Sequence, residues 1–382
     1  MHDVHREITR WLEPLGATVR VDAVGNLRAL YRASETPASR LLIGSHLDTV
    51  PNAGAFDGIL GVMLAIACLE ALEGKRLPYA IEVVGFSEEE GVRFGIPFIG
   101  SRALVGSVDD NLLNAEDAYG VSVRKAIQDF GLDPNEIGQA AFDPETRAYL
   151  EFHIEQGPVL EKLGLPLAAV ERIAGQSRWE VTFLGRSNHA GTTPMNLRLD
   201  AIAAAAEWIT LVEHVANTTP GLVATVGSVE TKPGATNVIA REARVSLDVR
   251  HPDDRDRNRA VESLVEQAKQ VAERRGLEVR PRERLSQAAV AMHSFLTSRI
   301  EEALRQTGCA SHRMVSGAGH DAMILAGKIP SAMIFLRTPG GISHDPAESV
   351  AVEDVAKAIE CGAHLLGQLA SAPTFHSRMC RA

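Results

Sequence analysis

The chain has 382 residues, of which 45% are hydrophobic and 23% are charged, and its formal net charge at pH 7 is −10. These values exclude a disordered or fibrous chain and leave room for two domains with large cores. An acidic balance without a run of Lys or Arg argues against a nucleic-acid-binding protein. No stretch approaches the roughly 20 apolar residues of a membrane span, and the polar start, Met1–Trp11, lacks the apolar segment of a signal peptide. We therefore expect a cytoplasmic protein that binds neither nucleic acid nor membrane.

The N-terminal part of the chain has the pattern of alternating strands and helices. The predicted elements are a helix over 4–15, strands over 18–21, 26–31 and 41–45, an apolar helix over 59–73 and a strand over 80–86. A strand, a helix and a strand at this spacing predict a parallel crossover, and hence an α/β domain.

Three residues that follow the 41–45 strand are suited to a divalent metal: His46, Asp48 and Asp57. Ligands of open α/β sheets bind beyond the carboxyl ends of strands, and imidazole with carboxylate suits a borderline-soft ion. Asp48 could accept the second ring N–H of His46 and fix its tautomer. Asp57 precedes the apolar helix, whose free N–H groups could hold its carboxylate while its two oxygens bridge two ions. The alternative is a plain loop in which Asp57 caps the helix.

Similar polar residues lie at the ends of three other predicted strands. They are Glu89 and Glu90 after strand 80–86, His153 in strand 147–154, and His344 after strand 331–336. A lone histidine is more often structural, but the strand ends of one α/β domain converge on one crevice. One bridging carboxylate, one further carboxylate and three imidazoles could hold two divalent ions. A second carboxylate that faces the activated water would be a competent general base.

The composition shifts near Ala174-Gly175, and a second domain is predicted from there to about Ala288. Its predicted elements are strand 178–184, helix 199–215, strands 222–229 and 242–250, helix 253–274 and strand 277–282. This β-α-β-β-α-β order is the split βαβ or ferredoxin-like unit. A helix over 352–370 then returns to the pattern of the first domain. We therefore expect a discontinuous catalytic domain, 1–175 with 289–382, and an inserted α+β domain, 176–288.

Nine segments carry a resemblance to a known family. They are GSHLDTVPNAGAFDGILGV (44–62), EEGVRFG (89–95), FIGSR (98–102), FHIEQGPVLE (152–161), GRSNHAGTTPM (185–195), GATNVI (234–239), DVRHP (248–252), GAGHDA (317–322) and GISHDPAE (341–348). In this order they resemble the dinuclear metal-dependent amidase/hydantoinase/carbamoylase family, which includes N-carbamoyl-L-amino acid hydrolase, allantoate amidohydrolase and β-ureidopropionase. The resemblance spans nearly the whole chain. It implies a zinc-aminopeptidase-like catalytic domain with an inserted lid and dimerisation domain, and therefore a homodimer.

The resemblance also implies roles for individual residues. Two divalent ions per chain (zinc, manganese, cobalt or nickel) would be held, one by His46, Asp57 and His153 and the other by Asp57, Glu90 and His344. Glu89 would be the general base, although Glu88 offers an acid one position earlier. The residues that bind the substrate would be Gln156, Asn237, Arg250 and Gly341. His189 would stabilise the oxyanion from across the dimer, and Asp48 and His320 would lie behind the ligands.

The implied reaction is hydrolysis of the ureido C–N bond of an N-carbamoyl amino acid or an allantoate-like ureido acid. Related deacetylases and dipeptidases usually carry a carboxylate where this chain has His153 followed by Glu155-Gln156, which favours the carbamoylase branch. Two alternatives are an N-acyl amino acid amidase or dipeptidase on the same site, and a catalytically silent metal-binding homologue. Arg250 offers a planar fork for a carboxylate, but without the resemblance an ion pair with the acidic 253–256 segment is favoured.

Overall fold

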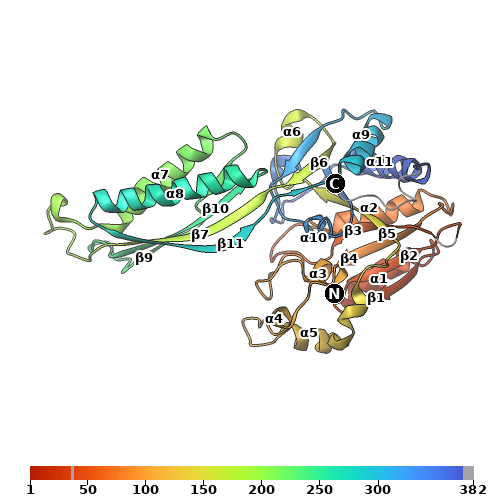
Figure 1. Ribbon diagram of the computed structural model, residues 1–382, viewed down its shortest axis with the longest axis horizontal. Helices are drawn as coiled ribbons and strands as arrows, with labels where there is room; N and C mark the ends of the chain where they lie inside the picture. Colours follow the sequence, from red (N-terminus) through yellow and green to blue (C-terminus); the bar gives the residue numbers. More distant parts are fainter. Residues whose placement is uncertain (36–37, 373–382) are drawn as a thin grey trace. The chain divides into compact units, whose positions relative to one another are not determined.

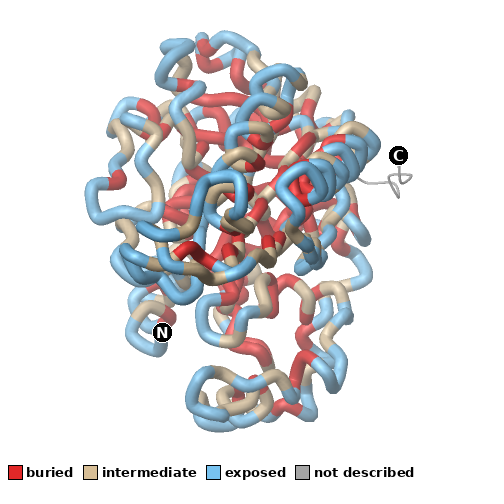
Figure 2. Tube along the Cα trace, turned by 90° about the vertical axis from the view of Figure 1, so that its left-hand side faces the viewer, coloured by how far each residue is buried: buried red, intermediate tan, exposed pale blue. Residues whose placement is uncertain are grey.

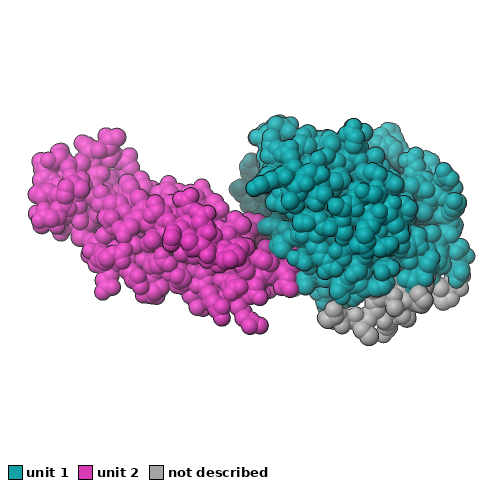
Figure 3. Space-filling model, turned by 90° about the horizontal axis from the view of Figure 1, so that it is seen from above, with its two compact units in different colours: residues 1–171, 291–382 teal, residues 172–290 magenta. Residues whose placement is uncertain are grey.

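The computed structural model describes residues 1–35 and 38–372 (Figure 1). The chain divides into two compact units, which are coloured separately in Figure 3. Unit 1 comprises Met1–Glu171 and the part of the chain from Ala291 onward, and unit 2 is Arg172–Val290. The sequence predicts these boundaries at 175/176 and 288/289.

Unit 1 is built on a mixed sheet, in which the described residues form nine strands in the order β1-β2-β4-β3-β5-β14-β6-β12, with β13 paired to β6. The strands are β1 (Thr18–Val21), β2 (Leu27–Tyr31), β3 (Arg40–His46), β4 (Ala80–Phe86), β5 (Thr146–Ile154), β6 (Leu167–Ile173), β12 (Val290–Ala291), β13 (Arg313–Ser316) and β14 (Ser331–Leu336). The central neighbours β4, β3, β5 and β14 run parallel, whereas β2 and β6 pair antiparallel at their flanks. The parallel crossover predicted between 41–45 and 80–86 is therefore confirmed.

The central strands are apolar because both faces of the sheet are covered. Every residue of β4 is buried, and the apolar run of β3 is at most 1% exposed. Figure 2 shows in red the buried residues of the described chain. One core cluster joins these strands to the helices α1 (His2–Leu12), α2 (Ile59–Glu70), α9 (Ser294–Gln306) and α11 (Val352–Ala370). The remaining helical segments are α3 (Ile99–Leu104), α4 (Asp110–Leu113), α5 (Val123–Asp129), η1 (Pro134–Ala140), α6 (Val159–Leu163), α10 (Asp321–Leu325) and η3 (Pro339–Gly341). None of the helices in the described ranges is long and apolar enough to cross a membrane.

Unit 2 is an antiparallel sheet with two helices on one face. Its elements are β7 (Gly175–Leu184), η2 (Met195–Leu197), α7 (Ala201–Thr218), β8 (Val223–Thr225), β9 (Val229–Lys232), β10 (Glu242–His251), α8 (Asp254–Arg274) and β11 (Glu278–Gln287). The strand order is β11-β7-β10-β8, and β9 also pairs with β10. Along β10, alternate residues are buried, and they pack with the buried Trp208 of α7 and residues of α8 in one core.

Several predicted elements differ from the structure in their bounds; for example, the helix predicted over 4–15 is His2–Leu12 and the strand predicted over 277–282 is Glu278–Gln287. The helix predicted over 59–73 ends at Glu70, because Glu73 and Gly74 adopt left-handed backbone conformations, with φ of 50° and 79°. The strand predicted over 222–229 is broken into β8 and β9. The N–H groups of Gly227 and Ser228 donate to the Ser246 hydroxyl, at 3.2 and 2.9 Å, so they are not available for continuous strand pairing.

Candidate metal centre

The carboxyl ends of four parallel strands carry the predicted metal-binding residues. His46 is the last residue of β3, His153 lies near the end of β5, Glu89 and Glu90 follow β4, and His344 follows β14 through η3. Because β4, β3, β5 and β14 are consecutive neighbours in the sheet, these ends lie along one edge. The convergence expected from the sequence is therefore present in unit 1.

Two groups of potential metal-binding atoms share Asp57, and within each group the atoms lie within 4.8 Å of one another. In the first group, Asp57 Oδ1 is 3.4 Å from His153 Nε2 and 3.9 Å from His46 Nε2. In the second group, His344 Nε2 is 3.1 Å from Asp57 Oδ2 and 3.3 Å from Glu90 Oε1. One carboxylate thus presents one oxygen to each group, as a bridging ligand would.

Two buried carboxylate oxygens in these groups are available to a cation. Asp57 Oδ2 and Glu90 Oε1 are buried and have no hydrogen-bond partner among the described residues. Burial, together with the nearby Asp57 carboxylate, raises the pKa of Glu90 to about 8. Burial also acts to raise the pKa of Asp57, but His153, His46 and His344 outweigh it, and that pKa lies below its usual value. Three imidazoles and two carboxylates form a donor set that fits divalent ions such as zinc or manganese.

The backbone orients the two buried imidazoles. The Nδ1 atom of His46 is 2.8 Å from the Asp48 carbonyl oxygen, and that of His153 is 2.8 Å from the Ile154 carbonyl oxygen. If both Nδ1 atoms donate, both Nε2 atoms are left free as acceptors for an ion. Burial, followed by the neighbouring His153, lowers the pKa of His46 and keeps its ring neutral. Gly58 makes room for this ring, since a Cβ at that position would lie 2.3 Å from His46 Cε1.

Of two expectations about the carboxylates, one holds in a different form and one is wrong. Asp48 does lie at the second ring nitrogen of His46, but through its backbone carbonyl, 2.8 Å from Nδ1, whereas its carboxylate is 3.9 Å from that nitrogen. Instead it accepts the N–H groups of Glu89 and Glu90, at 3.0 and 3.1 Å, and so fixes the segment that carries both acids. Asp57 does not cap α2, because Gly58 occupies the N-cap position and no side chain of the described residues caps this helix. The Asp57 carboxylate therefore remains available to the two groups.

Glu88 and Glu89 lie in different surroundings. Glu89 is 6% exposed, and burial with the charges of Asp321, Glu90 and Asp48 raises its pKa well above the usual value. Glu88 has a left-handed backbone, with φ of 54°, and it lines a separate hollow with Val24 and Phe94. The geometry favours Glu89 as the acid of the metal centre.

Gln156 and Gly341, predicted to bind substrate, also lie in unit 1. Gln156 adopts φ of 58°, and its Nε2 donates to Asp57 Oδ1 at 3.0 Å and to Ser343 Oγ at 3.2 Å. Gly341 has φ of 65°, and a Cβ there would lie 2.8 Å from the Pro158 nitrogen. Gln156 is therefore a neighbour of Asp57 in the structure.

Behind His153 lies a buried layer that includes His320, its neighbour Asp321, which the family pattern also places near the site, and Glu151, an acid that the sequence analysis missed. The ring of His320 packs edge-on against His153, with centroids 4.4 Å apart, and burial holds its pKa far below the usual value. Glu151 accepts hydrogen bonds from Ser45 Oγ at 3.2 Å and the Ala322 N–H at 2.9 Å, and burial raises its pKa to about 7. The second acid, Asp321, is fully buried. Strand alternation places Glu151 on the same face as His153, which is the signal that could have identified it.

The other predicted residues lie in unit 2. His189 and Asn237 are exposed and sit on paired segments, since the Ala190 N–H donates to the Asn237 carbonyl at 2.9 Å. Arg250 lies on β10, where its Nε and Nη2 donate to the two oxygens of Asp248 at 2.8 and 3.1 Å. The Arg250 fork is thus oriented by a carboxylate of its own strand.

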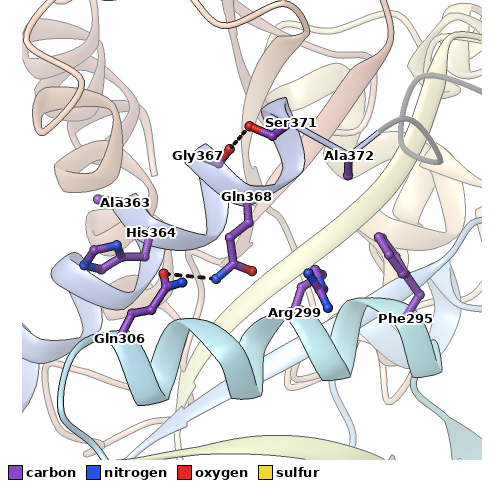
Figure 4. Close-up of a pocket in the computed structure, with 9 residues that line it drawn as sticks. All are labelled: Phe295, Arg299, Gln306, Ala363, His364, Gly367, Gln368, Ser371 and Ala372. Atoms are coloured by element: carbon purple, nitrogen blue, oxygen red, sulfur yellow. Dashed lines mark hydrogen bonds between the residues drawn. The ribbon is translucent and has the colours of Figure 1, made fainter.

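A separate hollow in unit 1 lies between α9 and α11 (Figure 4). Gln368 Nε2 donates to Gln306 Oε1 across it at 3.2 Å, and Phe295 and Arg299 line its other end. None of the predicted site residues lines this hollow. It is therefore distinct from the metal centre.

A parallel α/β sheet whose strand ends carry two histidine–carboxylate groups joined by one aspartate is the framework of a metal-dependent hydrolase. The chain belongs to Peptidase family M20/M25/M40, whose family model matches residues 42–368. This family is metal-dependent, and the clusters described above are groups that could bind metal.

Individual relatives place the chain more narrowly. It is 38% identical over 366 residues to N-carbamoyl-L-amino acid amidohydrolase of Geobacillus stearothermophilus, a match that covers 95% of this chain and 90% of that one. It is 37% identical over 382 residues to a probable allantoate deiminase of Oryza sativa subsp. japonica, covering 91% and 78%. A hydantoinase/carbamoylase family amidase from Burkholderia multivorans shares its fold with a TM-score of 0.88 and 32% identity, covering 96% and 90%. The predicted family resemblance and the α/β aminopeptidase-like class are confirmed.

Proposed function

We propose that this protein hydrolyses the ureido C–N bond of an N-carbamoyl amino acid or an allantoate-like ureido acid. The carbamoyl group would be released as ammonia and carbon dioxide, and the amino group of the product would be left free. The observation that carries this proposal is the pair of ligand groups joined by Asp57, in a chain 38% identical to an N-carbamoyl-L-amino acid amidohydrolase.

Two divalent ions per chain are assigned to these groups. His46, Asp57 and His153 hold one ion, and Asp57, Glu90 and His344 hold the other; zinc, manganese, cobalt and nickel all suit the donors. When bound, the ions lower the pKa of water and polarise the scissile carbonyl. The unpartnered oxygens of Asp57 and Glu90 support this assignment.

Glu89 is assigned as the general base. Its burial and its carboxylate neighbours raise its pKa, which makes it a stronger proton acceptor than an exposed carboxylate. It takes a proton from the attacking water and can pass it to the departing nitrogen. Asp48 supports it by accepting the N–H groups of residues 89 and 90. His320 supports the site from behind, by packing on His153.

Substrate binding is assigned to four residues, two from each unit. Gln156, Asn237, Arg250 and Gly341 bind it, with Arg250 at its carboxylate, because a planar guanidinium pairs with a carboxylate through two hydrogen bonds. The pairing with Asp248 supports this by holding the fork in one orientation. His189 stabilises the negative charge that develops on the carbonyl oxygen.

We further infer that the protein acts in the cytoplasm as a homodimer, with unit 2 as lid and dimerisation domain and with His189 reaching the partner's site. Mixing two inactive variants tests this arrangement. If His189 crosses over while Arg250 serves its own chain, refolded mixtures of His189→Ala and Arg250→Lys should recover activity in one of the two sites of each heterodimer. Mixtures that are no more active than either parent would refute the crossing.

The reaction itself is tested with a substrate panel. The purified protein, loaded in turn with zinc, manganese, cobalt or nickel, is assayed for ammonia release from N-carbamoyl-L-amino acids, allantoate and N-carbamoyl-β-alanine. We expect ammonia from at least one ureido acid. Release of free α-amine from N-acyl amino acids or dipeptides, without ammonia from any ureido acid, would refute the proposal in favour of an amidase or dipeptidase. Inactivity on every substrate would indicate a silent metal-binding homologue.

A further inference from the structure

Glu348 is a buried acid that has no role in the site described so far. It is 5% exposed and lies four residues after His344. Its Oε1 accepts the N–H groups of Phe56 and Asp57, each at 3.0 Å, and its Oε2 accepts the Ser343 hydroxyl at 3.1 Å. A single carboxylate thus ties the segment that enters α2 to the loop that carries His344.

Gly54 shows how closely the two segments pack around this carboxylate. A Cβ at position 54 would lie 2.3 Å from Glu348 Cβ and 2.6 Å from its Oε1. Both distances are too short for non-bonded atoms, so only glycine leaves room for Glu348 at this point. The two segments are therefore fitted to each other through this side chain.

The contacts of Glu348 close a ring of hydrogen bonds around the bridging aspartate. Ser343 Oγ accepts from Gln156 Nε2 at 3.2 Å, and the same Nε2 donates to Asp57 Oδ1 at 3.0 Å. The ring runs from Glu348 through the Asp57 backbone and carboxylate to Gln156, then to Ser343 and back. It joins segments that follow β5 and β14 with the one that precedes α2.

This ring of hydrogen bonds holds two residues of the second ligand group, Asp57 and the segment that carries His344. His344 has a left-handed backbone, with φ of 58°, a conformation that costs free energy and persists only where the surroundings hold it. The neighbouring Ser343 donates a hydrogen bond to Glu348, and His344 Nε2 lies 3.1 Å from Asp57 Oδ2. The first group shares Asp57, but its other two residues, His46 and His153, are positioned by the strands β3 and β5.

We propose that Glu348 is a positioning residue that sets the separation of Asp57 and His344 and thereby the affinity of the chain for the second metal ion. This inference rests on the proposed assignment of two ions. Removing the carboxylate frees the Phe56 and Asp57 N–H groups and the Ser343 hydroxyl together. The ion held by Asp57, Glu90 and His344 should then bind more weakly, whereas the ion held by His46, Asp57 and His153 should be affected less, because strands position two of its three ligands.

The test measures metal binding without substrate. Glu348→Ala, Glu348→Gln and the matched control Glu353→Ala, an exposed acid in the first turn of α11, are titrated with Mn²⁺ and Zn²⁺ against a chelator, and bound metal is counted by mass spectrometry. We expect Glu348→Ala to bind one ion with affinity close to that of the wild type and a second at least about tenfold more weakly, since loss of charge-assisted hydrogen bonds costs about a factor of ten or more in affinity. Glu348→Gln should lie between, because its amide oxygen still accepts N–H groups, and Glu353→Ala should match the wild type.

Two results would overturn the inference. One is two ions bound to Glu348→Ala with wild-type affinity. The other is equal weakening of both ions, which indicates general loss of structure; retention of the first ion is thus the internal control for folding. Wild-type protein that binds two ions but cleaves no ureido acid would refute the proposed reaction and leave the role of Glu348 standing.

Discussion

Replacing Glu89 by Gln should remove most turnover while the metal content stays unchanged. Gln has nearly the shape of Glu, and the backbone N–H of residue 89 would still donate to Asp48, now at 3.0 Å. The change therefore removes a proton acceptor and leaves the segment in place. Loss of general-base help costs about 10²–10⁴-fold in rate, which is about 2.7–5.5 kcal/mol of activation free energy.

The surroundings of Glu89 also fix the sign of the effect on stability. Burial, then the charges of Asp321, Glu90, Asp48 and Glu151, raises its pKa, so the ionised form is unfavourable where it lies. A neutral amide relieves this repulsion. The thermal midpoint of metal-free Glu89→Gln should therefore equal or exceed that of the metal-free wild type, which separates lost chemistry from lost structure.

The assay is ammonia release at saturating ureido acid, with bound metal counted on the same samples. Glu88→Gln is the matched control, because Glu88 lines a different hollow and should keep activity close to wild type. An active Glu89→Gln beside an inactive Glu88→Gln would place the base one residue earlier and refute this reasoning. Loss of metal from Glu89→Gln would show that Glu89 is a ligand.

Three further predictions concern packing and charge. Gly58→Ala should weaken metal binding in a chelator titration, because its Cβ would lie 2.3 Å from the His46 ring and residue 58 has φ of 68°. Glu82→Ala should lower the free energy of unfolding in urea by about 3–5 kcal/mol, because it leaves the buried Arg28, bonded to it at 2.7 Å, without its counter-charge. Burial, with the nearby N-terminal ammonium, lowers the pKa of His5 to about 4, so the unfolded chain takes up this proton at higher pH than the folded one. Stability should therefore fall as pH drops from about 6.5 to about 4, and His5→Leu should flatten that part of the curve.

The grouping of the candidate metal ligands could be predicted because its information is local. Parallel strands buried on both faces appear as continuous apolar runs, and the ligand-type residues follow these runs directly. His46 and His153 needed only the strand assignments to be placed. The fold class followed from the same runs and the crossover between them.

The remaining features depend on contacts between distant segments. The break between β8 and β9 is stabilised by the Ser246 hydroxyl of the neighbouring strand, which no local pattern shows. Asp48 has the spacing of a histidine partner, yet its carboxylate holds residues 89 and 90. The hydrogen bond from the Asp57 N–H to Glu348 could not be predicted for the same reason, since the two residues lie far apart in the sequence.

The two connections of unit 2 have a consequence for the order of folding. The two connections lie next to each other where they join unit 1, since the Met292 N–H donates to the Glu171 carbonyl at 3.0 Å. They are also neighbours within unit 2, where Gln287 pairs with Gln176. Closing an unfolded loop of roughly 100 residues costs about 3 kcal/mol more in chain entropy than closing a four-residue turn. A unit 2 that folds first brings its own ends together and removes most of that cost. Damage to the core around Trp208 should therefore slow assembly of the catalytic sheet, although none of these core residues belongs to it.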